Sequence, residues 1–189
     1  MKKMFIVAIT VSLVACNSGE NKTAAFSGKD STAKTTINTA PYTASYSSSF
    51  EMGDSRHAET ILALWSEWDN GNLEPSKSHF ADTVQLYTGD GSLISGPRDS
   101  AIAGAQSYRN MFTTVKSTLG AIFPIKSTDK NEDWVCVWGT EVTTDKNGKI
   151  DSVHLQETWR FNKQGKVDLL LQHTRAAKPV APVRMSATN

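Results

Sequence analysis

The 189-residue sequence is poor in cysteine and histidine, and it has no excess of either charge. It holds 2 cysteines and 4 histidines, and its 20 basic and 19 acidic side chains give a formal net charge of +1. Two cysteines cannot form a disulfide framework, and neither a Cys-x-x-Cys pair nor a histidine cluster indicates a zinc site. The balanced charge argues against the basic surface that nucleic-acid binding requires. We therefore expect a fold that rests on a hydrophobic core, with no cofactor, no metal and no nucleic-acid partner.

The sequence also lacks the run of about 20 apolar residues that spans a bilayer. A shorter apolar run, Phe5–Val14, follows Lys2 and Lys3 and leads to Cys16. This pattern is typical of a secretory signal peptide, here residues 1–15. Its last residues, Leu-Val-Ala-Cys, resemble the lipobox of bacterial lipoproteins, which implies that Cys16 is lipidated and anchors the chain in the bacterial cell envelope, at the outer membrane. The alternative is an ordinary signal peptide with a chance cysteine.

Residues 16–53 are predicted to be a tether that carries the lipid. Ser, Thr, Ala, Asn and Lys dominate this stretch, and no period of 2 or 3.6 is sustained. Such a composition cannot bury enough apolar surface to offset its ordering entropy. The alternative is a short strand or helix around residues 42–50 that packs on the domain. We expect one domain at residues 54–178 and a disordered tail at 179–189.

Apolar residues at helical spacing fill the first part of the domain. The helix stripe begins after a cap at Asp54 or Ser55 and ends near Asn70 and Gly71. A short helix is predicted from Glu74 to about residue 80, followed by a hairpin over residues 85–95. A longer helix is predicted from Pro97 to Gly120, with a stripe that includes Ala101, Ala105, Tyr108, Phe112 and Val115.

After Gly120 the apolar period changes to two. Strands are predicted near residues 121–126, 134–144, 150–162 and 167–175, with tight turns at Asn147-Gly148 and Gln164-Gly165. Helices followed by an antiparallel meander are typical of an α+β domain.

Two segments resemble the nuclear transport factor 2-like (SnoaL-like) superfamily. The first is Asp69-Asn70-Gly71-Asn72-Leu73-Glu74 with the later Phe80-Ala81-Asp82; the second is Glu157-Thr158-Trp159-Arg160-Phe161 with Gly165-Lys166-Val167. The resemblance covers residues 54–175. It implies a cystatin-like fold in which a curved antiparallel sheet wraps around the N-terminal helices and forms a cone with an internal pocket.

Within that superfamily, ketosteroid isomerase provides a comparison of catalytic groups. Its oxyanion-stabilising acid corresponds to Glu157 here, whereas its tyrosine corresponds to Leu64 and its base to Leu86 or Thr88. Two of the three chemical groups are therefore absent, and this activity is not expected.

Glu157 is the candidate catalytic residue on its own evidence too. It shares a strand face with Val153, Leu155 and Trp159, and a carboxylate among apolar side chains must be paired, hydrated or protonated. A pocket would supply water or a ligand; alternatively, Glu157 is a structural contact of an arginine or of Tyr108. The predicted pocket residues are Leu64, Trp68, Tyr108, Phe112, Val137, Glu157, Trp159 and Gln172.

Strand pairing predicts two further pocket groups. Pairing through Asn147-Gly148 sets Val137 opposite Glu157 and places Glu141 toward one end of the same face, as a solvated glutamate at the rim. The last strand is ambiguous, because a β-bulge near Val167 decides whether Gln172 or His173 faces the pocket. We favour Gln172.

Trp134, Cys136 and Trp138 are predicted on the opposite, convex face. Two exposed aromatic rings form an apolar patch that a soluble domain usually covers, so we expect a homodimer through Trp134 and Trp138. Alternatively, the tether covers the patch with Tyr42, Tyr46 and Phe50.

Three functions agree with these features. The first is a lipid-anchored domain that binds a small apolar or amphipathic molecule in its cone. The second is an isomerase, cyclase or hydrolase that uses Glu157, and the third is a non-catalytic dimerisation module.

Overall fold

The computed structural model describes residues 34–177. The elements in chain order are β1 (Thr35–Thr36), β2 (Ser49–Met52), α1 (Ser55–Asn70), the 3-10 helix η1 (Pro75–Ser78), β3 (Phe80–Tyr87), β4 (Leu93–Pro97), α2 (Arg98–Arg109), β5 (Phe112–Ser127), β6 (Glu132–Asp145), β7 (Ile150–Phe161) and β8 (Val167–Ala176). The predicted signal peptide, Cys16 and the tail at 179–189 lie outside the described residues.

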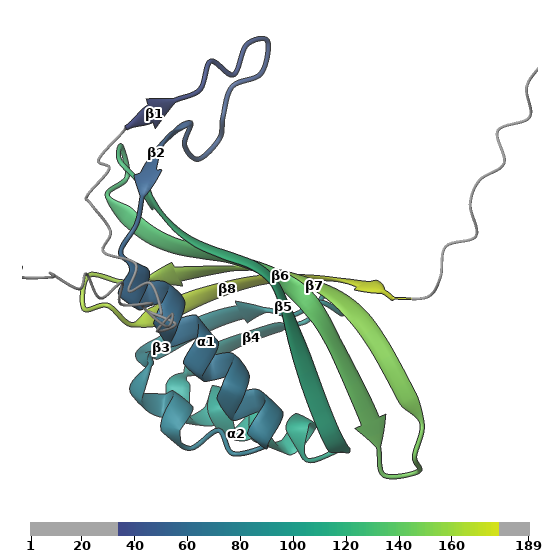
Figure 1. Cartoon of the computed structure of the whole chain (residues 1–189). Helices are drawn as coiled ribbons and strands as arrows, with labels where there is room; N and C mark the ends of the chain where they lie inside the picture. Colours follow the sequence, from purple (N-terminus) through teal and green to yellow (C-terminus); the bar gives the residue numbers. More distant parts are fainter. Residues whose placement is uncertain (1–33, 178–189) are drawn as a thin grey trace, which may run out of the picture. The chain divides into compact units, whose positions relative to one another are not determined.

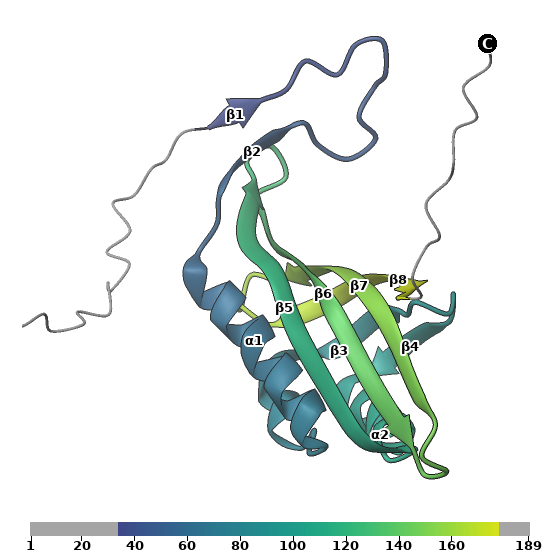
Figure 2. The ribbon, with the colours of Figure 1, turned by 45° about the vertical axis from the view of Figure 1, so that its right-hand side comes forward.

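One curved sheet of eight strands carries the helices against its concave side (Figure 1). The strand order is β1-β2-β5-β6-β7-β8-β3-β4, and in Figure 2 β5, β6 and β7 run side by side past α1 and α2. The predicted α+β cone is confirmed. The sheet is mixed, however, and not purely antiparallel, because β3 pairs with β8 in parallel. Parallel neighbours need a long connection, and here α2 and the meander β5–β7 supply it.

Helix α1 has the predicted boundaries. The Asp54 side chain accepts a hydrogen bond from the Arg56 backbone N–H at 2.9 Å, and Gly71 closes the helix in the left-handed conformation at φ 77°. Ile61 and Leu64 on its inner face are buried in the core. Within residues 34–177, neither helix is long and apolar enough to cross a membrane.

The long helix predicted from Pro97 to Gly120 is wrong in its second half. Helix α2 ends at Arg109, and β5 begins at Phe112 and continues through Gly120 to Ser127. β-Branched residues are dense after Phe112 and favour a strand, and β6 pairs along this whole segment. The apolar spacing of Phe112 and Val115 fitted a helix by chance. Tyr108 and Phe112 therefore reach the site from different elements.

Part of the predicted tether belongs to the sheet. Strand β2 pairs with the end of β5, with Phe50 opposite Ser127, and β1 pairs with β2. The ordered structure therefore begins before Asp54, which had been predicted to start the domain. This agrees with the alternative of a short strand near residues 42–50.

The predicted registers of the meander are confirmed. Val137 lies opposite Glu157 and Glu141 opposite Val153 in the β6–β7 pair. In the β7–β8 pair the register shifts between Phe161 and Arg160, next to Val167, and Gln172 lies opposite Glu157. This bulge decides the ambiguous last strand in favour of Gln172.

Candidate functional site

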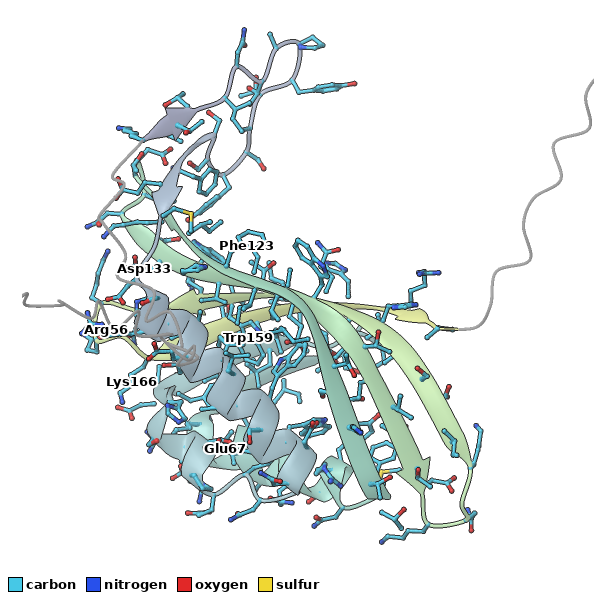
Figure 3. All side chains as sticks on the ribbon, in the orientation of Figure 1. Arg56, Glu67, Phe123, Asp133, Trp159 and Lys166 are labelled. Carbon is cyan, nitrogen blue, oxygen red and sulfur yellow. The ribbon has the colours of Figure 1, made fainter. Side chains whose placement is uncertain are left out.

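A cavity of about 740 Å³ lies between the helices and the concave face of the sheet. All predicted pocket residues except Val137 line it: Leu64, Trp68, Tyr108, Phe112, Glu157, Trp159 and Gln172. Val137 is wholly buried in the core instead, because neighbouring core side chains cover it. Trp159, labelled in Figure 3, lies between α1 and the sheet.

The C-terminal turn of α1 is held in place by a buried arginine. The Arg109 guanidinium donates to the backbone carbonyls of Trp68 and Asp69, at 2.6 and 2.8 Å, and to that of Phe112 at 3.1 Å. The carbonyls of Trp68 and Asp69 belong to the last turn of α1, which lacks N–H donors from a following turn, so Arg109 supplies donors there beside the Gly71 N–H that also bonds Trp68. The Asp69 carboxylate accepts from the backbone N–H and the hydroxyl of Ser117, both at 2.8 Å. Together these bonds fix the turn that carries Trp68 against β5.

Glu157 is 4% exposed and accepts hydrogen bonds only from neutral groups. The indole N–H groups of Trp65 and Trp159 donate to its Oε2 at 2.8 and 3.0 Å. The Gln172 amide donates to Oε1 at 2.8 Å. Burial raises the pKa of the Glu157 carboxyl, although the three donors act in the opposite direction. Among residues 34–177, neither an arginine nor Tyr108 forms a hydrogen bond or ion pair with it, so neither predicted structural partner is present there.

Trp65 is the site residue that sequence reasoning missed. It belongs to the apolar stripe of α1, and such a stripe does not show which aromatic ring reaches a polar partner. The signal that could have found it is the spacing to Trp68, since residues three apart lie on one helix face. Both indoles then point at acids of the facing sheet.

Gln172 connects the floor of the cavity to the turn between β3 and β4. Its Oε1 accepts from the Gly89 backbone N–H at 2.9 Å while its Nε2 donates to Glu157. A side chain at Gly89 would collide with Thr174, whose Cγ2 would lie 2.3 Å from a Cβ there. Glycine therefore lets the turn approach β8. His173, on the other face of β8, is exposed.

Glu141 is not the solvated rim residue that was predicted. It is half-buried, and its Oε2 accepts from the Trp68 indole N–H at 2.7 Å. Burial raises the pKa of the Glu141 carboxyl, and the negative charges of Glu157 and Asp69 add to the shift. The prediction failed because α1 covers this end of β6.

Three aromatic rings surround the Glu141 end of the cavity. The rings of Trp68 and Tyr108 are stacked with centroids 6.2 Å apart, and Phe112 meets Tyr108 edge-on at 5.3 Å. Burial and the nearby Glu141 charge raise the pKa of the Tyr108 hydroxyl. This end of the cavity therefore combines an acid with aromatic faces and edges.

The cavity wall carries more acid than base. Among the described residues, its carboxyl side chains are Asp90, Glu141, Asp145, Asp151 and Glu157, and its only basic side chain is Lys149. Among residues 34–177, neither Glu141 nor Glu157 forms an ion pair. In the same part of the chain, no group of three His, Cys, Asp or Glu residues is placed to hold a metal ion.

On the opposite face of the sheet, the two predicted interface tryptophans differ. Trp134 is only 8% exposed because Tyr46 covers it edge-on, with ring centroids 5.7 Å apart. Its predicted role as an exposed dimer anchor is therefore wrong, and the alternative of a covering N-terminal segment applies to it. Trp138 is 46% exposed and packs edge-on against Phe123.

Solved structures with the same architecture are numerous, although no family model and no curated protein matches the sequence. A putative SnoaL-like polyketide cyclase from Shewanella denitrificans superposes with a TM-score of 0.54 at 11% identity, over 65% of this chain and 92% of that one. The described chain has the NTF2-like (SnoaL-like) fold. AusH from Aspergillus nidulans gives a TM-score of 0.53 at 13% identity, over 68% and 89% of the two chains. An NTF2-like protein of unknown function from Burkholderia pseudomallei gives 0.52 at 18%, over 65% and 92%.

The positions matched to ketosteroid isomerase can now be placed within this SnoaL-like fold. Leu64, Leu86 and Thr88 all line the cavity, so the tyrosine and the base have no chemical equivalents at these positions. Glu141 is the other carboxyl deep in the wall, and it comes from β6, where the comparison placed no catalytic group. The ketosteroid isomerase constellation is therefore absent.

Proposed function

We propose that this domain binds a small, largely apolar molecule in the cone cavity. The observation that carries the proposal is the cavity of about 740 Å³, whose accessible lining is mainly apolar although several carboxyl and hydroxyl side chains contribute to its wall. That size and composition are typical of small-molecule sites, which hold an apolar body and orient it with a few polar contacts.

A fluorescent apolar probe tests this function. The neutral dye N-phenyl-1-naphthylamine should bind with increased emission, and Ala105→Phe, which fills the cavity from α2, should weaken binding at least about tenfold. Ala103→Phe on the exposed side of the same helix is the matched control and should leave binding unchanged. Equal binding by both variants, or none by the unaltered protein, would contradict the proposal.

We also propose that the protein is a lipoprotein of the bacterial cell envelope, anchored through Cys16. The support is the sequence pattern of Lys2, Lys3, the short apolar run and the Leu-Val-Ala-Cys string. Cys16→Ala should abolish incorporation of a fatty-acid analogue and release the protein from membranes. Label retained by the variant would refute the anchor.

An enzyme is the second candidate function. Two carboxyl groups with raised pKa values, Glu157 and Glu141, line one cavity, and acids whose pKa values are shifted by burial in a cavity are candidates for proton transfer. Several proteins with this fold are described as polyketide cyclases or related enzymes. No titratable side chain lies within hydrogen-bond distance of Glu157 among the described residues, which favours binding. Turnover of a bound ligand that Glu157→Gln abolishes would favour the enzyme.

Self-association is the third candidate, now restricted to the part of the convex face around Trp138. Its exposed indole beside Phe123 is the supporting observation. If this surface joins two copies, Trp138→Lys should convert a dimer to a monomer in light scattering. A mass unchanged by the substitution would count against it.

A further inference from the structure

The two innermost acids of the cavity have neutral partners only. Glu157 is contacted by two indoles and one amide, and Glu141 by one indole. Lys149, the one basic side chain that residues 34–177 contribute to the wall, is exposed near the β6–β7 turn and forms no ion pair with either acid. The Arg109 guanidinium acts on Glu141 from a distance but is bonded to backbone carbonyls and forms no ion pair with it. A buried carboxylate without an ion-pair partner is costly, so a positive charge that entered the cavity would be favoured.

Glu141 is the acid that can receive a further partner. Trp68 occupies its Oε2, whereas its Oε1 accepts no hydrogen bond from any residue in the 34–177 range. The stacked rings of Trp68 and Tyr108 lie beside it, and Phe112 packs on Tyr108. Aromatic faces attract cations through the ring quadrupole, and the attraction adds to that of a nearby carboxylate.

We infer that the ligand of this cavity is a cationic amphiphile, whose amine or quaternary ammonium group lies beside Glu141 among Trp68, Tyr108 and Phe112. Its apolar body extends toward the deeper wall formed by Phe80, Trp159 and Leu170. This inference rests on the proposed ligand-binding function and narrows its ligand to one charge class. A carboxylate, sulfate or phosphate ligand would meet several like charges in the wall, and is disfavoured.

Three probes of nearly equal shape separate charge from apolar burial. Benzyltrimethylammonium carries the cation, neopentylbenzene replaces its nitrogen with carbon, and benzylphosphonate carries an anion. Each displaces N-phenyl-1-naphthylamine from the full protein in a competition titration. We expect the cation to bind at least about tenfold more tightly than the neutral probe, and the anion to bind most weakly.

Charge-removing variants locate the cation. Glu141→Gln keeps an acceptor for Trp68 and should reduce the preference for the cation about tenfold, while affinity for neopentylbenzene stays the same. Glu59→Gln removes the same charge from the exposed side of α1 and should leave the preference intact. Unchanged affinity for the neutral probe shows that the Glu141→Gln variant is folded with its cavity open.

The outcomes distinguish this inference from the proposed function. If the neutral probe binds as tightly as the cation, or the anion binds best, the inference of a cationic ligand is wrong, whereas the proposed binding of an apolar molecule is retained. If Glu141→Gln still prefers benzyltrimethylammonium to neopentylbenzene, the cation does not lie beside Glu141. If neither the dye nor any probe binds, the proposed function itself fails.

Discussion

The two faces of the sheet use tryptophan N–H groups in opposite electrostatic settings. On the convex face, Trp134 donates to the Tyr46 hydroxyl at 2.9 Å, and that hydroxyl donates to Glu132 at 2.6 Å. The Arg160 guanidinium lies 5.7 Å from the Trp134 ring centre and pairs with Asp168 at 2.9 Å. Inside the cone, Trp65 and Trp68 donate directly to Glu157 and Glu141, and neither acid forms an ion pair within residues 34–177.

This difference distinguishes acids whose contacts stabilise the fold from acids whose burial costs the fold stability. An acid with a cation close by gains in the folded state, whereas an acid desolvated among neutral donors gains less than its burial costs. The convex face therefore resembles an ordinary packed surface. The concave face holds charge in an unfavourable place, which is typical of binding and catalytic sites.

Removing the acceptor at Glu157 should have the largest effect on stability. Glu157→Leu leaves the N–H groups of Trp65, Trp159 and Gln172 buried without partners, and should lower the free energy of unfolding by about 3 kcal/mol or more. Asp168→Leu on the convex face is the matched case and should cost about 1 kcal/mol, because its pair with Arg160 is partly exposed. Urea denaturation measures both. Equal losses would show that the two faces do not differ.

A smaller effect concerns the pH dependence of stability. Because the folded state raises the pKa of Glu157, it binds that proton more tightly than the unfolded chain does. The stabilisation from this carboxyl is present at low pH and is lost as pH rises from the ordinary value of 4.5 through the raised one. Glu157→Gln should abolish this part of the slope in denaturation at a series of pH values. An unchanged slope would mean that Glu157 titrates normally.

The half-buried Asp54 shifts its pKa in the opposite direction, because a cation lies beside it. The Arg56 side chain and backbone N–H lower the pKa of the Asp54 carboxyl from 3.8 to about 2. Its stabilisation is present above 3.8 and is lost as pH falls through about 2. Asp54→Ala should therefore cost about 1 kcal/mol at pH 7, mostly as a lost helix cap, and nearly nothing in strong acid. If Asp54→Ala lowers the free energy of unfolding equally at pH 7 and in strong acid, the charge of the Asp54 carboxylate does not contribute to stability.

The smallest expected effect is at Tyr46. Tyr46→Phe keeps the ring over Trp134 but removes the hydroxyl between Trp134 and Glu132, at a cost of about 0.5 kcal/mol, since water can replace an exposed partner. Tyr46→Ala also uncovers the Trp134 ring and should shift tryptophan emission to longer wavelength. Identical emission from both variants would argue that the N-terminal segment does not cover Trp134 in solution.

The meander and one acid of the site were predictable from local patterns. Period-two alternation with Asn-Gly and Gln-Gly turns predicted the strands and the register that sets Val137 opposite Glu157. The alternation also showed Glu157 on an apolar face. Strand patterns carry this information because each turn fixes the register of the two strands it joins.

The remaining features depend on contacts between distant segments. The residues after Arg109 have apolar spacing that fits a helix and β-branched side chains that favour a strand, and pairing with β6 decides between the two. The partner of an indole N–H is likewise set by tertiary packing, so Trp65 and the burial of Glu141 were missed. Tyr46 covers Trp134 from 88 positions away, a contact without a local signature.

The Gln172 amide gives the floor of the cavity a fixed polarity. A backbone N–H can only donate, so the bond from Gly89 assigns the oxygen of this amide and leaves its nitrogen pointing at Glu157. The amide cannot turn over without losing both bonds. Both oxygens of Glu157 therefore already accept hydrogen bonds. Glu141 is bonded through Oε2 alone, so its carboxyl group is held less firmly. The cavity wall thus holds one acid fixed through both oxygens, Glu157, and one fixed through a single oxygen, Glu141, so among the described residues only Glu141 has an oxygen left for a further donor.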